Sequence, residues 1–345
     1  MLRYTDCKGR FLVDVIMPTF NHENYVAKAI QSVLMQECSF GYRLIIGEDC
    51  SNDGTLRICE LFAHENPGLI LLLKNLSNIG IAANYKSLFN ISSSKYIAIL
   101  EGDDYWIDRH KLQKQVEVLE SRSEIGLVHT NYYSFYESGK MKKGHVWEKT
   151  DLLSGNVIGP TQTANININP LTTCFRSFLA KENVDFDFII NNKLLTVDIF
   201  LWAEICRRSN VLYIDEVTGV YRIHSNSITG NTNINSVERF SRTSLLMVNY
   251  LMEKYETPKN VKRAFYSKNK IDLVYRYLLA NQSSKAYFEL DNIKDLETVR
   301  EKIIYLSAKY RQLNFLSKML ARFFDLGSNF KQAINRVIGS FNHLK

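Results

Sequence analysis

Residues 96–104 have the sequence Tyr96-Ile-Ala-Ile-Leu-Glu-Gly-Asp-Asp104, in which an apolar run ends in a cluster of acidic side chains. A run that is apolar at nearly every position predicts a β-strand buried on both faces. The adjacent carboxylates of Asp103 and Asp104 repel each other unless a positive group neutralises them, so they are candidate ligands of a divalent cation. The alternative is a capped turn with two surface acids.

Strand and helix patterns alternate on both sides of this stretch. Short apolar runs predict strands, and helical periodicity predicts the helices between them. The strands are expected at residues 13–17, 44–46, 69–73, 96–100 and 125–129, and the helices at 24–36, 56–64, 84–89 and 111–120. Asn21 or Asn24 is the expected N-cap of the first helix. Apolar strands separated by helices predict an α/β fold with a mostly parallel sheet flanked by helices.

Polar clusters follow three of the predicted strands, at residues 18–21, 48–55 and 103–104. Such sheets bind their ligands at the carboxyl ends of the strands, so we expect the three clusters to meet at one edge. Neither a GxGxxG nor a GxxxxGK[ST] motif is present, which disfavours a dinucleotide-binding fold and a P-loop.

The later part of the chain is less regular. Residues 131–195 are rich in Asn, Ser, Thr and Tyr, and they precede a predicted helix at 198–207 and strands at 211–214 and 220–224. From residue 237 the pattern is helical, with a long apolar and basic pattern at 305–324. We therefore expect a sheet domain over residues 1–230 and a C-terminal helical extension over residues 231–345.

Charge is unevenly distributed along the chain. Residues 246–345 contain 18 Lys and Arg against 9 Asp and Glu, whereas residues 1–245 contain 25 against 27. Because the larger part is slightly acidic, no nucleic-acid partner is expected. The basic helices suit a cap on the sheet domain, a homodimer surface or peripheral docking on an anionic membrane.

Cysteines and apolar segments limit the expected location. The six cysteines form no CxxC pair and no Cys/His cluster typical of zinc sites. Residues 1–10 lack the apolar core of a signal peptide, and no stretch reaches the roughly 20 apolar residues that span a bilayer. The expected location is the cytoplasm, including the inner face of the membrane.

Six short motifs, taken in order along residues 12–228, resemble those of family-2 glycosyltransferases with the Rossmann-like GT-A fold. They are Val15-Ile-Met-Pro-Thr-Phe-Asn21, Ile46-Gly-Glu-Asp49 with Ser51-Asn-Asp-Gly-Thr55, Asn78-Ile-Gly80 with Asn84, Leu100-Glu-Gly-Asp-Asp-Tyr-Trp106, Thr196-Val-Asp198 with Trp202, and Asp215-Glu216 with Tyr221-Arg-Ile-His224. The resemblance implies an inverting transferase that moves a sugar from a nucleotide sugar, most often UDP-linked, to an acceptor hydroxyl.

The resemblance also implies the contacts of the nucleotide-sugar donor. These contacts are Pro18, Thr19, Phe20, Asn21, Asp49, Asp53, Asn84, Asp103 and Arg222. The first four line the base and ribose, Asp49 binds the base, and Asp53 lies near the nucleotide. Asn84 positions the donor, Asp103 contacts ribose or sugar, and Arg222 neutralises the leaving diphosphate.

The same resemblance implies Mg²⁺ or Mn²⁺ as the cofactor. Asp104 would bind the metal and His224 would be a further metal or phosphate ligand, although the adjacent Asp–Asp pair leaves the direct carboxylate ligand open. Asp198 is the implied general base, since a carboxylate opposite the leaving group can take the proton of the attacking hydroxyl. Asp198 also suits an ordinary acid at a helix N-terminus, and His224 a polar core or surface residue.

Other residues have a structural alternative as well. Asp53 lies in an Asn-Asp-Gly sequence typical of turns. Trp106 and Trp202 suit either stacking on the acceptor sugar or packing. Glu48 and Glu101 are expected to be structural rather than catalytic.

Together these assignments predict a glycosyltransferase of bacterial surface polysaccharide synthesis, as in capsule or lipopolysaccharide, with a carbohydrate or lipid-linked carbohydrate acceptor. A processive synthase is disfavoured because the sequence has no Gln-x-x-Arg-Trp motif and no membrane span. A sugar nucleotidyltransferase is disfavoured because no Gly-rich basic signature occurs near the N-terminus. The remaining alternative is a catalytically inert nucleotide-sugar-binding or scaffold protein, against which Asp103, Asp104 and Asp198 argue.

Overall fold

The computed structural model describes residues 11–144, 154–155, 168–224, 233–290, 293 and 299–309 of the chain. The chain divides into two compact units, of which the first comprises residues 1–231 and 246–255 and the second residues 232–245 and 256–345. The division after residue 231 lies one residue from the predicted domain boundary. The segment Leu246–Tyr255 differs from that prediction, because it belongs to the first unit.

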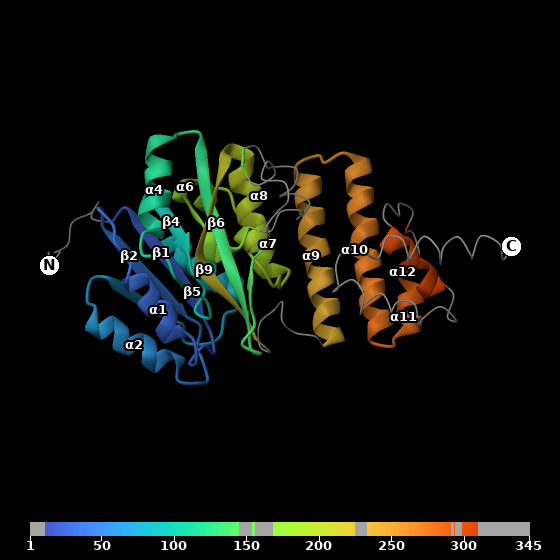
Figure 1. The fold of residues 1–345 in the computed structure, drawn as a ribbon, viewed down its shortest axis with the longest axis horizontal. Helices are drawn as coiled ribbons and strands as arrows, with labels where there is room; N and C mark the ends of the chain where they lie inside the picture. Colours follow the sequence, from blue (N-terminus) through green and yellow to red (C-terminus); the bar gives the residue numbers. More distant parts are fainter. Residues whose placement is uncertain are drawn as a thin grey trace. The chain divides into compact units, whose positions relative to one another are not determined.

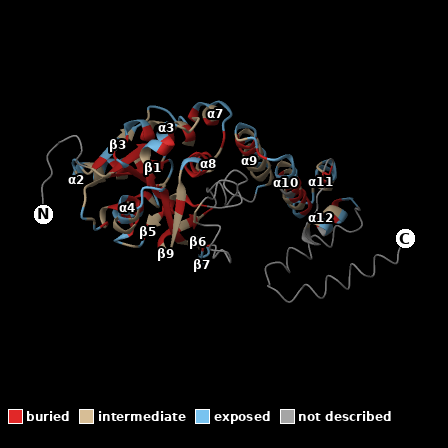
Figure 2. Cartoon of the chain, turned by 90° about the horizontal axis from the view of Figure 1, so that it is seen from above, coloured by how far each residue is buried: buried red, intermediate tan, exposed pale blue. Residues whose placement is uncertain are grey.

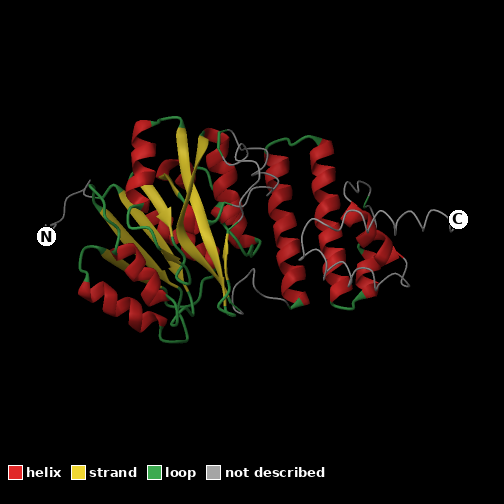
Figure 3. Ribbon diagram, in the orientation of Figure 1, coloured by secondary structure: helices red, strands yellow, loops and turns green. Residues whose placement is uncertain are grey.

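The first unit is built on one mixed sheet with helices on both faces (Figures 1 and 3). Its described strands are β1 (Val13–Thr19), β2 (Tyr42–Glu48), β3 (Ile70–Lys74), β4 (Tyr96–Ile99), β5 (Tyr105–Trp106), β6 (Ile125–Tyr136), β7 (Met141–Lys143), β8 (Cys174–Arg176) and β9 (Asn210–Ile223). Their order across the sheet is β3-β2-β1-β4-β8-β6-β9-β5, and β7 pairs with β6. The predicted α/β class with flanking helices is confirmed.

The sheet is parallel where the apolar runs predict it, from β3 through β2 and β1 to β4. Beyond β4 it is mixed, because β8 runs antiparallel to both β4 and β6, whereas β6 and β9 are parallel. β8 has three residues within the stretch that lacked periodicity, and so short a strand leaves no pattern to recognise. The sequence therefore predicted the parallel half and missed the strand that joins it to the rest.

Helices cover both faces of this sheet. The helices of the first unit are α1 (Val26–Leu34), α2 (Thr55–Glu65), α3 (Ile81–Ile91), α4 (Lys111–Ser121), α6 (Ser177–Lys181), α7 (Phe186–Asn191), α8 (Asp198–Arg208) and the second half of α9 (Ile234–Lys254). Buried side chains of α1, α2 and α4 share one core cluster, and those of α3, α6, α7 and α8 share another. The buried residues in Figure 2 follow the sheet and the helix faces turned toward it.

Strand β1 shows how a mostly apolar run supplies both cores, with Asp14 as its buried charged exception. Val13, Val15 and Met17 belong to the cluster with α1, and Ile16 belongs to the cluster with α3. Successive side chains of a strand point to opposite faces, so a strand between two helical layers is apolar at most positions on both faces. Where this buried strand ends, at Thr19, the chain reaches the edge of the sheet, and the residues that follow it lie there.

Three local predictions need correction. α1 begins at Val26, and its N-cap residue Tyr25 makes no side-chain capping bond, so neither Asn21 nor Asn24 caps the helix. The strands expected at 211–214 and 220–224 are one strand, β9. β6 runs on to Tyr136, and its last residues are only half-buried, which is why they carry no apolar run.

The second unit is helical in its described part. It contains the first half of α9, α10 (Lys259–Leu279), α11 (Ser283–Phe288) and α12 (Val299–Lys309), which share a small core around Val274, Tyr277, Ala286 and Ile304. Residues 310–324 of the predicted long helix lie outside the described residues. Among the described helices, none has the length and apolar character needed to cross a membrane.

Candidate active site

The loops that follow β1 and β2 are tied together by hydrogen bonds. Asn21 has a φ of 55°, a left-handed conformation that asparagine adopts more readily than most residues. Its N–H donates to Ser51 Oγ at 2.9 Å, and its Oδ1 accepts from the Asn52 N–H at 2.9 Å. The His22 N–H donates to Thr55 Oγ1 at 2.7 Å. The two predicted polar clusters therefore form one continuous surface.

The end of β1 also joins the end of β4. The Gly102 N–H donates to the Pro18 carbonyl at 3.1 Å, and the Asp49 N–H donates to the Thr19 carbonyl at 3.0 Å. All three polar clusters thus meet at one edge of the sheet, as the strand pattern predicts. Phe20 is 36% exposed at this edge, so its ring is accessible to a ligand.

Asp53 holds the loop before α2 in shape. Its Oδ1 accepts from the N–H and the hydroxyl of Thr55, at 3.0 and 2.6 Å, and its Oδ2 accepts from the Glu23 N–H at 3.2 Å. Burial acts to raise the pKa of Asp53, but these hydrogen bonds outweigh it and lower that pKa. These bonds fit the turn alternative for Asp53, and its contact with a nucleotide stays a prediction.

Asp49 and Asn84 are buried and already engaged by the chain. Asp49 Oδ1 accepts from Asn75 Nδ2 and the Ile79 N–H, and its Oδ2 accepts from the Gly80 N–H, each at 2.9 Å. These bonds fold residues 75–80 around the carboxylate. Asn84 Nδ2 donates to the Gly47 carbonyl at 2.8 Å, which ties α3 to the end of β2. Their predicted contacts with the donor stay predictions.

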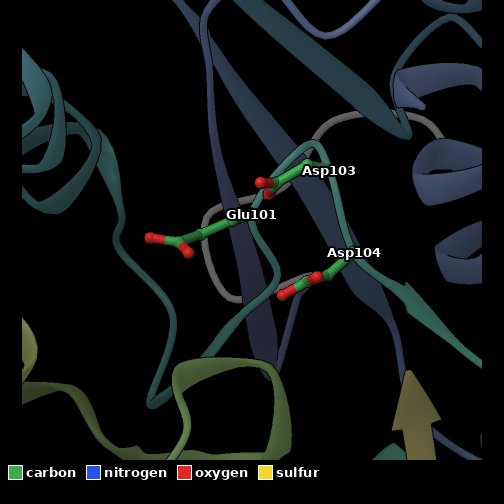
Figure 4. Close-up of side chains that lie close together, drawn as sticks. All are labelled: Glu101, Asp103 and Asp104. Atoms are coloured by element: carbon green, nitrogen blue, oxygen red, sulfur yellow. The ribbon is translucent and has the colours of Figure 1, made fainter. Parts of the chain in front are cut away.

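Three carboxylates gather on the loop after β4 (Figure 4). One oxygen from each of Glu101, Asp103 and Asp104 lies within 4.8 Å of the others. Glu101 therefore belongs to the acidic cluster, which differs from the purely structural role expected for it. The structural role expected for Glu48 is confirmed, because its carboxylate accepts from the Cys50 and Ser51 N–H groups at 3.2 and 2.8 Å.

Protein donors engage one oxygen of each of these three carboxylates. Glu101 Oε1 accepts from the Tyr85 hydroxyl at 2.9 Å, and Asp104 Oδ1 accepts from the Arg222 N–H at 2.8 Å. Asp103 Oδ2 lies 3.1 Å from His224 Nε2. Within the described part of the chain, these bonds orient the three carboxylates through one oxygen of each.

The crowding of these acids shows in their pKa values. Burial and the charge of Asp103 raise the pKa of Glu101 to about 8. Burial and the charge of Asp103 also raise the pKa of Asp104. For Asp103, burial acts in the same direction, but the hydrogen bond with His224 and the nearby His22 outweigh it and lower the pKa. A cation beside these carboxyl groups would favour their ionised forms and so lower their pKa values.

Two imidazoles approach the same oxygen of Asp103. His224 Nε2 lies 3.1 Å from Asp103 Oδ2 and His22 Nε2 lies 3.9 Å from it. His22 Nδ1 is 3.1 Å from Thr19 Oγ1, which fixes the ring. The sequence analysis missed His22, although its place directly after the first polar cluster was a usable signal. The role of His224 as a metal or phosphate ligand stays a prediction.

Arg222 lies beside the acidic cluster. Besides the main-chain bond to Asp104, its Nη1 donates to the Asp103 carbonyl. The residue is 9% exposed, and burial lowers the pKa of the guanidinium against the opposing pull of Asp104 and Tyr105. An arginine stays protonated under such a shift, so it is the cation built into this acidic edge.

Asp198 is the first residue of α8. Its Oδ1 accepts from the Ile199 N–H at 2.9 Å, and burial raises its pKa. Its charge is close enough to Glu101 to contribute to the raised pKa of that residue. Asp198 therefore combines the helix-terminal position of the structural alternative with a location near the acidic cluster.

Both tryptophans singled out by the sequence are packing residues. Trp106 Nε1 donates to the Leu171 carbonyl at 2.7 Å, and Trp202 Nε1 donates to the Ile168 carbonyl at 2.8 Å. Each side chain is buried in a core cluster. Neither ring is available to stack on a sugar.

The comparisons with known proteins agree with this architecture. Residues 14–185 match the model of the family described as Glycosyl transferase family 2. Among solved structures, the mannosyltransferase PcManGT from Pyrobaculum calidifontis, in complex with GDP-Man and Mn²⁺, superposes with a TM-score of 0.55 at 14% identity. The superposition covers 90% of this chain and 84% of that one, and at this identity it shows a shared fold.

Two curated relatives illustrate the range of similarity. The uncharacterized protein Rv1520 of Mycobacterium tuberculosis is 33% identical over 127 residues, which is 37% of each chain. WfgD of Escherichia coli, a UDP-Glc:alpha-D-GlcNAc-diphosphoundecaprenol beta-1,3-glucosyltransferase, is 24% identical over 229 residues, or 64% of this chain and 81% of that one. The chain thus spans little more than a third of the first relatives that it matches.

An α/β sheet that gathers an acidic cluster and two interlocked polar loops at one edge fits the glycosyl transferase class that the family model describes. The chain belongs to glycosyl transferase family 2.

Proposed function

We propose that this protein transfers a sugar from a nucleotide sugar, UDP-linked by preference, to an acceptor hydroxyl with inversion at the anomeric carbon. The observation that carries the proposal is the trio Glu101, Asp103 and Asp104 at the end of β4, beside the loops after β1 and β2. This edge combines acids that need a cation with polar loops and an exposed aromatic ring, which suit a nucleotide diphosphate.

The acidic trio fits a divalent cation on chemical grounds. Carboxylate oxygens are the donors that Mg²⁺ and Mn²⁺ prefer, and the bonds described above orient the three carboxylates within 4.8 Å of one another. A cation would also offset the burial and the charge of Asp103 that together raise the pKa of Glu101 and Asp104. Asp104, with Asp103 and Glu101, would hold the metal, which would stabilise the charge on the leaving diphosphate.

The side chains around the trio supply the remaining functions. Phe20 and the loop residues Pro18, Thr19 and Asn21 would line the base and ribose, with Asp49 on the base. Arg222 would neutralise charge on the leaving diphosphate, because its guanidinium donates to the Asp103 carbonyl and its main-chain N–H to the Asp104 carboxylate.

Asp198 would act as the general base. Burial raises the pKa of its carboxyl, which strengthens its affinity for the proton of the acceptor hydroxyl. A base that works opposite the leaving diphosphate gives a single displacement, and one displacement inverts the anomeric carbon. Asp53 and Asn84 would help to bind the donor by holding the loops that they contact. His224 would do so through the Asp103 carboxylate beside it.

The acceptor and the pathway extend the proposal. The printed name of WfgD describes an acceptor on diphosphoundecaprenol, which supports a lipid-linked carbohydrate acceptor in bacterial surface polysaccharide synthesis here. The basic C-terminal helices of residues 231–345 would then hold the protein at the inner face of the membrane, or join two copies. Sedimentation with anionic vesicles at low salt tests the first arrangement, and light scattering tests the second.

Donor hydrolysis without acceptor tests the central proposal. The purified chain is incubated with UDP-Glc, UDP-GlcNAc, GDP-Man or dTDP-rhamnose, with Mn²⁺ or with EDTA, and the released nucleotide is measured. We expect slow hydrolysis of at least one donor that EDTA and Asp104→Asn abolish. The surface variant Glu60→Gln serves as the control, since Glu60 is paired with Lys74 on the surface and belongs to none of the polar clusters described above. Donor binding without hydrolysis under any condition would favour the inert binding protein.

A further inference from the structure

Basic side chains and tyrosine rings alternate in a column that ends beside the acidic cluster. The proposed function gives no role to the two tyrosine rings, those of Tyr25 and Tyr105. Lys28 Nζ lies 3.7 Å from the centroid of the Tyr105 ring, and the Arg222 guanidinium carbon lies 4.5 Å from that same centroid. The guanidinium carbon is also 5.2 Å from the Tyr25 ring. The Tyr25 ring stacks on His224, with 4.8 Å between centroids and 27° between planes.

The two tyrosines come from separate parts of the chain. Tyr25 directly precedes α1, whereas Tyr105 is in the two-residue strand β5 and pairs with Val220 of β9. Arg222 and His224 lie at the end of β9. Three chain segments therefore converge to place one guanidinium between two rings, which is a more specific arrangement than an incidental surface contact.

Core packing does not account for these rings. Both tyrosines are partly exposed, and neither belongs to the apolar clusters of the described residues. Their described contacts are instead with Lys28, Arg222 and histidine side chains. A cation over the face of a tyrosine is attracted by the ring, and the attraction grows as water is excluded.

Electrostatics explains why tyrosine rings, and not further carboxylates, contact the Arg222 guanidinium. Arg222 stands beside Asp103 and Asp104, and a further carboxylate partner would add negative charge where a diphosphate must enter. Aromatic faces restrain a guanidinium without adding net charge and leave its N–H edge for a bidentate anion. Within the described residues, the hydrogen bonds of the guanidinium involve Nη1 alone, so Nε and Nη2 remain for such a ligand.

We propose that Tyr25 and Tyr105 are positioning residues that clamp Arg222, and through Tyr25 also His224, for recognition of the donor diphosphate. This inference rests on the proposed function, because the diphosphate belongs to the nucleotide sugar. In this proposal the aromatic rings of the two tyrosines, and not their hydroxyl groups, position Arg222 and His224.

Binding of UDP and of uridine separates this role from a structural one. Affinities are measured with Mn²⁺ by calorimetry for UDP and by ligand-observed NMR for uridine, with GDP and guanosine as the second pair. Tyr25→Leu and Tyr105→Leu should each weaken UDP binding about 3- to 30-fold, the range that partly desolvated cation–ring contacts support, and change uridine binding by less than about 2-fold. Tyr25→Phe and Tyr105→Phe should bind both ligands as the native chain does.

The matched control is Tyr305→Leu, which removes a partly buried tyrosine of the second unit that also lies near a lysine, Lys309. It should leave both affinities unchanged. Leucine variants that bind UDP normally, or that lose UDP and uridine equally, would overturn the clamp, and so would phenylalanine variants as weak as the leucine ones. A native chain that binds none of UDP, GDP and dTDP would instead refute the proposed function.

Discussion

Gly102→Ala tests whether the acidic loop is positioned by its contact with the end of β1. A Cβ on Gly102 would lie 2.8 Å from Thr19 Cβ and from His22 Nδ1, and closer still to Thr19 Oγ1. Thr19 is on a buried strand and His22 is held by hydrogen bonds, so neither can move away freely. The acidic loop must shift instead, which displaces Asp103 and Glu101.

The cost follows from overpacking. Inserting a methyl group into a tight contact destabilises by about 1–3 kcal/mol. For a unit of this size, that loss lowers the Tm by roughly 2–12 °C. A displacement of about 1 Å at the site costs on the order of 100-fold in donor hydrolysis.

Thermal unfolding and donor hydrolysis of Gly102→Ala are measured beside Gly68→Ala. Gly68 has a φ of 80° with open space around it, so its substitution costs about 1 kcal/mol through backbone strain without touching the site. We expect Gly102→Ala to lose both stability and hydrolysis, and Gly68→Ala to lose stability alone. Full hydrolysis by Gly102→Ala would refute the claim that this contact sets the position of the acids.

Three further predictions concern the core, a buried lysine and the base. Asp14→Ala should lower the free energy of unfolding in urea by about 3–5 kcal/mol, because it leaves Arg43 and the Ser93 and Ser94 N–H groups without their acceptor. The surface variant Glu60→Ala should lower it by less than about 1 kcal/mol. Burial lowers the pKa of Lys111 from 10.5 to about 7, so between these values the unfolded chain binds more protons and stability rises with pH. Between pH 7.5 and 9.5 the free energy of unfolding should therefore rise more steeply with pH in the native chain than in Lys111→Met, by up to about 1.4 kcal/mol per pH unit. Equal slopes in the two proteins would contradict a buried, neutral amine at Lys111. Asp198→Asn should bind the donor normally and transfer about 100-fold or more slowly, and unimpaired transfer would remove Asp198 as the base.

The sequence predicted the parts of the fold that depend on local pattern. Strands β1 to β4 carry apolar side chains on both faces because helices cover both faces, and this leaves nearly continuous runs that are easy to recognise. β8 is too short for a pattern, and the end of β6 is half-buried, so neither could be recognised. The meeting of the polar clusters was predictable, because parallel strands end at one edge.

The site was less predictable where it depends on contacts between distant segments. The bonds that engage Asp49 and Asp53 within the chain involve loops that no periodicity describes. Glu101 differs from Glu48 only in its surroundings, since Glu101 lies beside Asp103 and Asp104 whereas Glu48 accepts from the N–H groups of its own loop. The contacts of Tyr25 and Tyr105 with Arg222 join three segments and leave no signal in sequence spacing.

The most direct test of the account is the coupling between Mn²⁺ and UDP measured by calorimetry. The account predicts that Mn²⁺ strengthens UDP binding by about 5- to 150-fold in the native chain, the usual range for coupled ligands, and that Asp104→Asn removes this effect. UDP binding that is indifferent to Mn²⁺, or coupling that survives in Asp104→Asn, would contradict a metal and diphosphate site built on Glu101, Asp103 and Asp104.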